Sequence, residues 1–239
     1  MTLQDQRIVV LGGTSGIGLA IAAAAVAAQA AVVVGSSSQT RVDAAVAALG
    51  EQATGAVIDL SDAAAIRAFF GRIGPFDHLV YTAGEPLKLL GLDADIAEMR
   101  RFFELRYWGA LSAAQAARGA IRKGGSIVFT SGTAAARPLG AGWAAASSIC
   151  GAMEGLTRAL AIELQPLRVN CVAPGVVKTP LWSGMRNEDQ EAFYAAEARR
   201  LPVAHAGEVS EIALSYLYLM SQTYVTGQVL HVDGGGLLT

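Results

Sequence analysis

A glycine-rich loop near the start of the chain has the composition and spacing of a phosphate-binding turn. Residues 12–18 read Gly-Gly-Thr-Ser-Gly-Ile-Gly, directly after an apolar run and directly before a helix-like stretch. Glycines let the backbone turn sharply, and the free N–H groups at the start of the next helix bind anions. No Gly-Lys-Ser/Thr follows, which argues against a nucleoside triphosphate. A plain strand-to-helix turn is the alternative. The loop predicts a dinucleotide site at Gly12, Thr14, Ser15, Gly16, Ile17 and Gly18.

The end of the second apolar run indicates which dinucleotide is bound. An NAD site favours a carboxylate here, which accepts a hydrogen bond from the ribose 2′-OH. This chain instead has three serines followed by an arginine, namely Ser36, Ser37, Ser38 and Arg41. Hydroxyl and guanidinium donors suit a 2′-phosphate. We therefore expect NADP(H) to be favoured over NAD(H); the alternative is a polar loop with a helix-starting serine and a solvated arginine.

Apolar runs alternate with helical periodicities along the chain. Strands are expected at 7–11, 31–35, 55–59, 78–81, 126–130, 168–172 and 229–232. Helices are expected at 16–30, 41–49, after Ser61 as N-cap, at 93–120 with Ile96, Met99, Phe102 and Phe103 inward, and at 144–164 and 210–220. This alternation predicts an α/β fold, a Rossmann-like doubly wound parallel sheet of about seven strands with helices on both faces. Ligands of such sheets bind outside the carboxyl ends of the strands.

Composition narrows the classes of function. The chain has 239 residues, of which 53% are hydrophobic and 16% charged, with a net charge of −2. It lacks linkers and repeats, so we expect one domain over 1–239. It has no Lys/Arg block, which argues against nucleic acid as a partner. The two cysteines, Cys150 and Cys171, lack metal-ligand spacing, so we expect no metal and a reducing, cytoplasmic location.

One apolar segment is long enough to be considered as a membrane-spanning helix. Residues 17–35 contain Gln29 as their only polar side chain. Most of the segment is alanine, and it ends in the β-branched run 32–34. We interpret it as a buried helix that leads into a buried strand, and we expect no membrane span.

Several motifs together resemble the short-chain dehydrogenase/reductase family, over nearly the whole chain. The glycine loop is similar to that family's TGxxxGxG, with Leu11 in the Thr position. Residues 81–84 (Tyr-Thr-Ala-Gly) are similar to its NNAG, with both asparagines changed. Further similarities are Asp59-Leu60, residues 155–164, the segment from Arg168-Val169-Asn170 through Pro174-Gly175 to Thr179, and Asp233-Gly234-Gly235.

The resemblance implies a nicotinamide-dependent oxidoreductase and gives these residues roles. It implies that Gly12, Ser15 and Ile17 lie at the cofactor's phosphates and that Asp59 and Leu60 lie at adenine. It implies that Ala83 and Gly84, next to Thr82, lie along the adenosine ribose. It also implies that Pro174, Gly175, Val177 and Thr179 flank the nicotinamide.

The chain departs from the family's pattern where the chemistry takes place. The family uses an Asn, a Ser and a Tyr-xxx-Lys pair; counting back from Gly155 puts the last two positions on Ala146 and Cys150. No tyrosine lies between residues 107 and 194, and no lysine between 123 and 178. The Ser position falls on Gly132 or Thr133, beside Ser131, and the Asn position falls on Arg106.

Replacement catalytic groups must therefore come from elsewhere in the chain. Ser131 and Thr133 are candidates for polarising a carbonyl, and Arg106 for stabilising an oxyanion or holding a carboxylate. The alternative for Arg106 is a salt bridge that fills vacated space. For Cys150 we expect a small buried filler.

The leading hypothesis is an NADP-dependent oxidoreductase that acts on a small carbonyl or alcohol with non-standard catalytic residues. The alternative is a non-catalytic NADP(H)-binding sensor or scaffold, and a third possibility is reduction of a conjugated C=C bond. The resemblance places a substrate lid at 181–206, where Trp182, Met185, Phe193 and Tyr194 are candidate pocket residues. It also implies a homodimer or homotetramer through helices 144–164 and 93–120.

Overall fold

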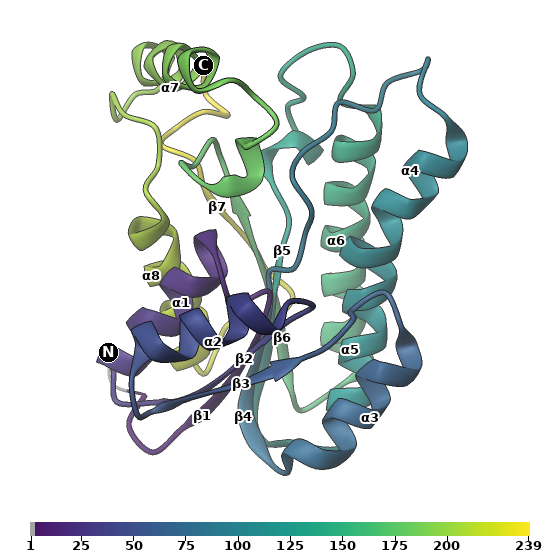
Figure 1. Cartoon of the computed structure of the whole chain (residues 1–239), viewed down its shortest axis with the longest axis vertical. Helices are drawn as coiled ribbons and strands as arrows, with labels where there is room; N and C mark the ends of the chain where they lie inside the picture. Colours follow the sequence, from purple (N-terminus) through teal and green to yellow (C-terminus); the bar gives the residue numbers. More distant parts are fainter. Residues whose placement is uncertain (1–2) are drawn as a thin grey trace.

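A seven-stranded parallel sheet forms the centre of the molecule (Figure 1). The computed structural model describes residues 3–239. The strands are β1 (Arg7–Leu11), β2 (Ala31–Ser36), β3 (Ala53–Val57), β4 (Phe76–Tyr81), β5 (Ile121–Thr130), β6 (Arg168–Pro174) and β7 (Val229–Val232). Their order is β3-β2-β1-β4-β5-β6-β7, and neighbouring strands pair in parallel. The predicted Rossmann-like fold is confirmed.

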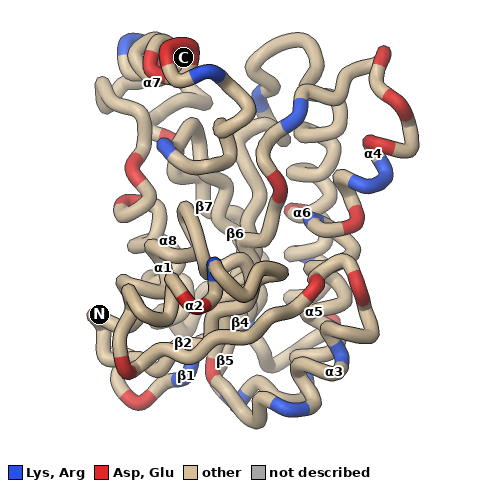
Figure 2. Tube along the Cα trace, viewed as in Figure 1, with Lys and Arg blue, Asp and Glu red and all other residues tan. Residues whose placement is uncertain are grey.

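Helices cover both faces of this sheet (Figure 1). One layer contains α1 (Gly16–Ala27), α2 (Gln39–Leu49) and α8 (Val209–Ser221). The other contains α3 (Ala63–Ile73), α4 (Ile96–Phe103), α5 (Gly109–Ala117) and α6 (Ala144–Glu163). The remaining helix, α7 (Asn187–Arg200), lies at one end of the molecule near the C-terminus. The charged residues are spread over the outer parts of the chain rather than gathered along one element (Figure 2).

Alternate residues of each central strand feed two separate cores. In β1, Val9 and Leu11 belong to the core under α3, α5 and α6, whereas Ile8 and Val10 belong to the core under α1 and α8. All four side chains are fully buried. Burial on both faces explains why the strand is a continuous apolar run rather than an alternating one.

The apolar segment 17–35 is a helix followed by a strand, as predicted. Helix α1 ends at Ala27 and β2 begins at Ala31, with Ile21, Val32 and Val34 buried in the same core. Within residues 3–239, no helix has both the length and the apolar character needed to cross a bilayer.

Several predicted boundaries were wrong; β5, for example, begins at Ile121 rather than at residue 126. Three others differ for local reasons. Helix α3 is capped by Asp62, whose carboxylate accepts from Ala64 N at 2.7 Å, and not by Ser61. The Ser61 hydroxyl donates to Asp59 instead, at 2.6 Å. Strand β3 covers Ala53–Val57 rather than 55–59, so Asp59 follows the strand. Helix α2 begins two residues earlier than expected, at Gln39.

The long helix predicted at 93–120 consists of three parts. Asp95 caps α4, a π-helical segment η1 (Glu104–Trp108) follows it, and α5 ends at Ala117. Ile96 was expected to face inward but is 60% exposed, whereas Phe102 is buried as predicted. Ile96 is the first residue of α4, so it lies at the start of the helix, ahead of the buried turn that carries Phe102. The π segment begins only after Phe103 and interrupts the predicted continuous helix.

The cap of α3 is testable with two adjacent variants. Asp62→Ala is expected to lower the free energy of unfolding by about 1 kcal/mol, because it leaves a first-turn N–H without its acceptor. Ser61→Ala is expected to change it by less than about 0.5 kcal/mol. Urea denaturation followed by circular dichroism measures both. An equal or larger loss for Ser61→Ala would contradict this assignment of the cap.

Candidate active site

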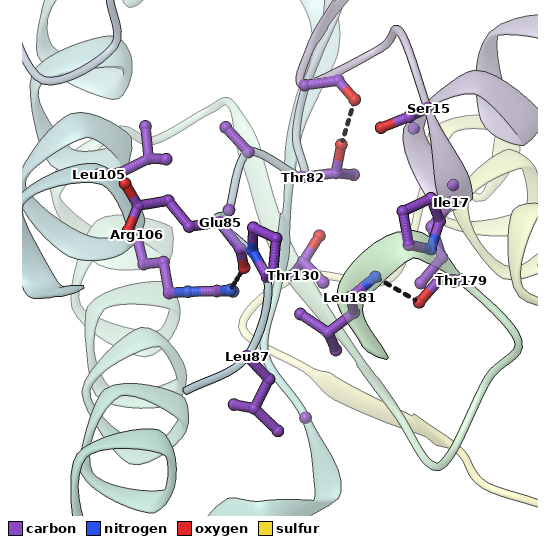
Figure 3. Close-up of a pocket in the computed structure, with 18 of the residues that line it drawn as sticks. Ser15, Ile17, Thr82, Glu85, Leu87, Leu105, Arg106, Thr130, Thr179 and Leu181 are labelled. Atoms are coloured by element: carbon purple, nitrogen blue, oxygen red, sulfur yellow. Dashed lines mark hydrogen bonds between the residues drawn. The ribbon is translucent and has the colours of Figure 1, made fainter. Parts of the chain in front are cut away.

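A cavity of about 800 Å³ lies at the carboxyl ends of the strands. The segments that follow β1, β2, β4, β5 and β6 all contribute to its wall, as expected at the point where the strand order reverses. The close-up in Figure 3 shows side chains converging from both sides of the strand ends. Of the candidate cofactor-binding and catalytic residues predicted from the sequence, all but Ser38 line this cavity.

The glycine loop is pressed tightly against the end of β4. The Thr82 hydroxyl donates to the carbonyls of Leu11 and Gly12, each at 3.3 Å, and Thr82 N donates to Leu11 O at 2.9 Å. A Cβ on Gly18 would overlap the Gly12 carbonyl and lie 2.5 Å from Thr82 Oγ1. The Ser15 side chain makes no capping bond to the first turn of α1. The N–H groups at this helix start therefore remain available to an anion such as a pyrophosphate.

A polar pocket follows β2 and β3 at one end of the cavity. Ser36, Ser37 and Arg41 line it, and Arg41 Nη2 lies 3.4 Å from Ser37 Oγ. Ser38 does not line it, because its hydroxyl caps α2 by accepting from Arg41 N at 3.4 Å. Asp59, which follows β3, faces this pocket from the next strand along the sheet. Hydrogen bonds from Ser61 lower the pKa of Asp59 and so hold its carboxylate ionised.

The π-helical segment η1 is held in place by Tyr81 at the end of β4. The Tyr81 hydroxyl donates to the Leu105 carbonyl at 2.5 Å. A Cβ on Gly109 would overlap both Tyr81 Oη and the Leu60 carbonyl, so the helix lies unusually close to the sheet. Burial raises the pKa of Tyr81, which keeps this hydroxyl protonated as a donor. The contact fixes the segment that carries Arg106.

Arg106 extends from η1 along the wall of the cavity (Figure 3). Its Nη2 donates to the Glu85 carbonyl, and its Cζ lies 4.7 Å from the centre of the Phe102 ring. Its Nε is buried without a hydrogen-bond partner in the described structure. Burial lowers the pKa of Arg106, although a guanidinium stays charged in proteins. The salt bridge considered from the sequence is not formed: no carboxylate of residues 3–239 lies within ion-pair distance of this guanidinium.

The end of β5 and the start of α6 form the wall that the family resemblance assigns to chemistry. Ala146 and Cys150 both line the cavity, one helical turn apart. Burial raises the pKa of the Cys150 thiol to about 11, so the thiol is protonated at neutral pH. Its sulfur lies 3.3 Å from where a Cβ on Gly132 would be. The Ser131 hydroxyl donates to the Cys150 carbonyl at 3.1 Å, and Thr133 begins a short 3₁₀ turn, η2 (Thr133–Ala135).

Aromatic side chains close the far end of the cavity. Trp182, in the 3₁₀ turn η3 (Pro180–Trp182), is held by a bond from its Nε1 to the Val177 carbonyl at 2.9 Å. Its ring centre lies 6.4 Å from that of Trp143 and 4.8 Å from that of Phe193. Met185, Phe193 and Tyr194 were candidates for the pocket wall but do not line this cavity. Phe193 packs behind Trp182 instead, because α7 lies outside η3.

Several lining residues gave little signal in the sequence. Thr130 and the backbone of Glu85 are examples, because ordinary residues become part of a wall only when distant strands end side by side. The segment that contains Glu85 is joined to η3 by a bond from Leu87 N to Leu181 O at 2.8 Å. Among residues 3–239, no group of three His, Cys, Asp or Glu side chains is placed to hold a metal ion.

The comparisons with known proteins agree with this geometry. A family model described as Enoyl-(Acyl carrier protein) reductase matches residues 12–236. Short-chain dehydrogenase/reductase fsr5 of Gibberella fujikuroi is 31% identical, over 99% of this chain and 96% of the relative. The chain belongs to the short-chain dehydrogenase/reductase family. As a family member it is an oxidoreductase of the nicotinamide-binding fold.

Two solved structures are close in shape. A small-chain dehydrogenase in complex with NADPH is 34% identical, with a TM-score of 0.83 over 98% of this chain and 99% of that one. The MalC Reductase/Diels-Alderase of Malbranchea aurantiaca is 27% identical, with a TM-score of 0.92 over 99% of this chain and 98% of that one.

The tight glycine loop predicts a strong effect of one methyl group. Gly18→Ala is expected to weaken the binding of nicotinamide nucleotides at least about tenfold, because the added Cβ must displace the Gly12 carbonyl. Fluorescence titration of the purified protein measures this. Gly71→Ala in α3 is the matched control, since a Cβ there meets nothing within 4 Å. Equal binding by the two variants would contradict the assignment of the loop.

Proposed function

We propose that this protein is an NADP(H)-dependent oxidoreductase that acts on a small carbonyl compound or the corresponding alcohol with non-standard catalytic residues. The observation that carries the proposal is a continuous cavity that joins a phosphate-binding helix start to a wall containing Arg106, Ser131 and Thr133. When bound, the nicotinamide group supplies a hydride, or accepts one. The segment 181–206 acts as the cover of the substrate end, with Leu181 and Trp182 as its contact residues.

The residues present fit a phosphorylated dinucleotide. Gly12 and Gly18 let the loop pack against the end of β4, which supports a pyrophosphate at the start of α1. Asp59 and Leu60 line the cavity and are expected to contact adenine. The polar pocket of Ser36, Ser37 and Arg41 carries no carboxylate of its own, which favours a 2′-phosphate over a free 2′-hydroxyl. Pro174, Gly175, Val177 and Thr179 line the opposite end, toward the aromatic side chains.

By the family resemblance, the usual proton donor is replaced in this chain. Ala146 and Cys150 lie where the resemblance places Tyr and Lys, and loss of a general acid costs about 10²–10⁴-fold in rate. Positioning by the cavity and electrostatic help from Arg106 remain as sources of catalysis. Ser131 and Thr133 contribute hydroxyl groups on the facing wall.

The cofactor preference is tested by comparing NADPH with NADH. NADPH is expected to bind at least about tenfold more tightly, and Arg41→Ala is expected to remove most of that difference, because a 2′-phosphate loses its guanidinium partner. Calorimetric titration gives both affinities. A preference for NADH in the unmodified protein contradicts this part of the proposal.

A non-catalytic NADP(H) sensor is the second candidate, and the replacement of Tyr and Lys by Ala146 and Cys150 favours it. The two functions differ in turnover. A panel of ketones, conjugated ketones and alcohols, followed by absorbance of the reduced nicotinamide, is expected to show oxidation or reduction of the cofactor. Tight cofactor binding without any turnover supports the sensor instead.

We infer a homodimer or homotetramer that uses the outer face of α6. Ala144, Ser148, Gly151, Gly155 and Ile162 are exposed along it, so small and apolar residues face outward where charged ones are usual. Ser148→Arg is expected to reduce the mass measured by light scattering to that of one chain. A single-chain mass in the unmodified protein refutes the inference.

A further inference from the structure

Two tryptophan side chains meet in the wall of the cavity. Trp143 directly precedes α6 and Trp182 ends η3, and both line the cavity. Their ring centres lie 6.4 Å apart, and the ring planes are inclined at 50° to each other. Rings at this separation touch, so the two inclined planes form an apolar corner. A flat ring gains contact with both sides of such a corner, because it packs against the face of one indole and the edge of the other.

The Trp182 side of this corner is fixed by contacts from outside the cavity. The Trp182 indole donates from Nε1 to the Val177 carbonyl at 2.9 Å. The Phe193 ring does not line the cavity and supports the indole from behind, with the ring centres 4.8 Å apart. An indole has no other hydrogen-bonding group, so its surface toward the cavity is apolar. Its orientation is already set, and little side-chain entropy is lost when a ligand packs against it.

Small and aliphatic side chains surround the corner. Ala146 lies one helical turn beyond Trp143, and Leu87 and Leu181 also line the cavity. A hydrogen bond from Leu87 N to Leu181 O at 2.8 Å joins the segment after β4 to η3, and the two residues are neighbours in Figure 3. None of these side chains is charged. We call the space that they border the indole slot, which is lined by Leu87, Trp143, Ala146, Leu181 and Trp182.

Hydroxyl groups line the same cavity as the indole slot. Ser131 and Thr133 follow β5 and both contribute to the wall. The Ser131 hydroxyl donates to the Cys150 carbonyl at 3.1 Å, so its proton is used while its oxygen can still accept. Ligand pockets are mostly apolar, with a few polar groups that set the orientation of the ligand. A compound with one oxygen function and an apolar body therefore matches the chemistry of this lining.

Shape distinguishes between apolar bodies of equal size in the indole slot. A flexible alkyl chain must lose rotational freedom to lie in it. A globular cage touches each flat indole over a small area. A fused aromatic ring system is rigid and lays a whole face on an indole, and aromatic pairs gain affinity beyond their buried area. The slot therefore favours a flat, rigid body over the other two.

We propose that the substrate is a flat fused-ring ketone or the corresponding alcohol, and that Trp143 and Trp182 are the residues that select it. This inference rests on the proposed NADP(H)-dependent function and narrows its substrate class. The balanced reduction consumes ketone, NADPH and one proton, and it yields alcohol and NADP⁺. The hydride forms the new C–H bond at the carbonyl carbon, and a proton from water completes the hydroxyl group. Oxidation of the alcohol is the reverse.

The shape preference is tested by binding. 2-Acetonaphthone and 1-adamantyl methyl ketone share an acetyl group and the same number of carbon atoms, but one body is flat and the other globular. Equilibrium dialysis of the protein saturated with NADP⁺ is expected to show at least about tenfold tighter binding of 2-acetonaphthone. Binding is measured because the adamantyl ketone is also intrinsically slower to react. Equal affinities, tighter binding of the adamantyl ketone, or no binding of 2-acetonaphthone overturns the inference.

The selecting role of Trp143 is tested with Trp143→Leu, Trp143→Phe and the control Trp108→Leu. The Trp143 side chain makes no capping bond to α6, so its replacement leaves the helix start intact. Trp108 is 51% exposed and does not line the cavity, which makes it a matched control.

The expected result is a change in preference rather than a general loss of binding. Trp143→Leu is expected to weaken the binding of 2-acetonaphthone about tenfold and that of the adamantyl ketone less than about threefold. Trp143→Phe is expected to keep most of the preference, because it keeps a flat ring, and Trp108→Leu to keep all of it. An equal loss for both ketones would make the role of Trp143 structural, and either that result or an unchanged preference overturns the inference.

Turnover separates this inference from the proposed function. With NADPH, 2-acetonaphthone is expected to be reduced to the naphthyl alcohol, which chromatography of the product detects. Reduction of small ketones such as cyclohexanone, without reduction of 2-acetonaphthone, overturns the inference and leaves the proposed function standing. No turnover of any ketone or alcohol overturns both.

Discussion

The architecture of the site depends on how closely the end of β1 approaches the end of β4. Thr82 bonds to the carbonyls of Leu11 and Gly12, and the missing side chains of Gly12 and Gly18 allow that contact. Because the strands are parallel and adjacent, this single contact sets both the start of α1 and the path of the chain beyond Tyr81. The free amides at the start of α1 and the backbone of Ala83 and Gly84 are therefore placed together.

A second set of contacts fixes the segment that carries Arg106. Tyr81 is the last residue of β4, and its hydroxyl bonds to the Leu105 carbonyl within the π-helical segment. A π turn leaves backbone groups out of the regular helical pattern, so an outside donor stabilises it. The side chain at 106 is thereby directed along the cavity, where Glu85 O and the Phe102 ring hold it. Arg106 owes its position to the sheet as much as to its own helix.

The sequence was informative where a property depends on nearby residues. Buried parallel strands are continuous apolar runs, so β1 has the predicted bounds, and residues that follow such runs were correctly placed at one edge of the sheet. The partly exposed edge strand β7 also has the predicted bounds. It was less informative where two neighbours compete for one role, as Ser61 and Asp62 do at α3, or where a serine both caps a helix and resembles a ligand, as Ser38 does. The π segment was not predictable, because Tyr81 is over twenty residues away from it in sequence.

The pairing state of Arg106 was also beyond the reach of sequence reasoning, because it depends on which side chains lie near it in space: Glu85 acts on its charge, yet no carboxylate of residues 3–239 lies within ion-pair distance. That state has a chemical consequence. A guanidinium fixed by a backbone carbonyl and an aromatic ring keeps its field without reorganising when charge develops nearby. Such a site discriminates by where negative charge arises during the reaction rather than by the shape of the substrate alone. Negative charge that develops beside this guanidinium gains more from that field than a neutral ground state does, and a difference of this kind is what accelerates a reaction.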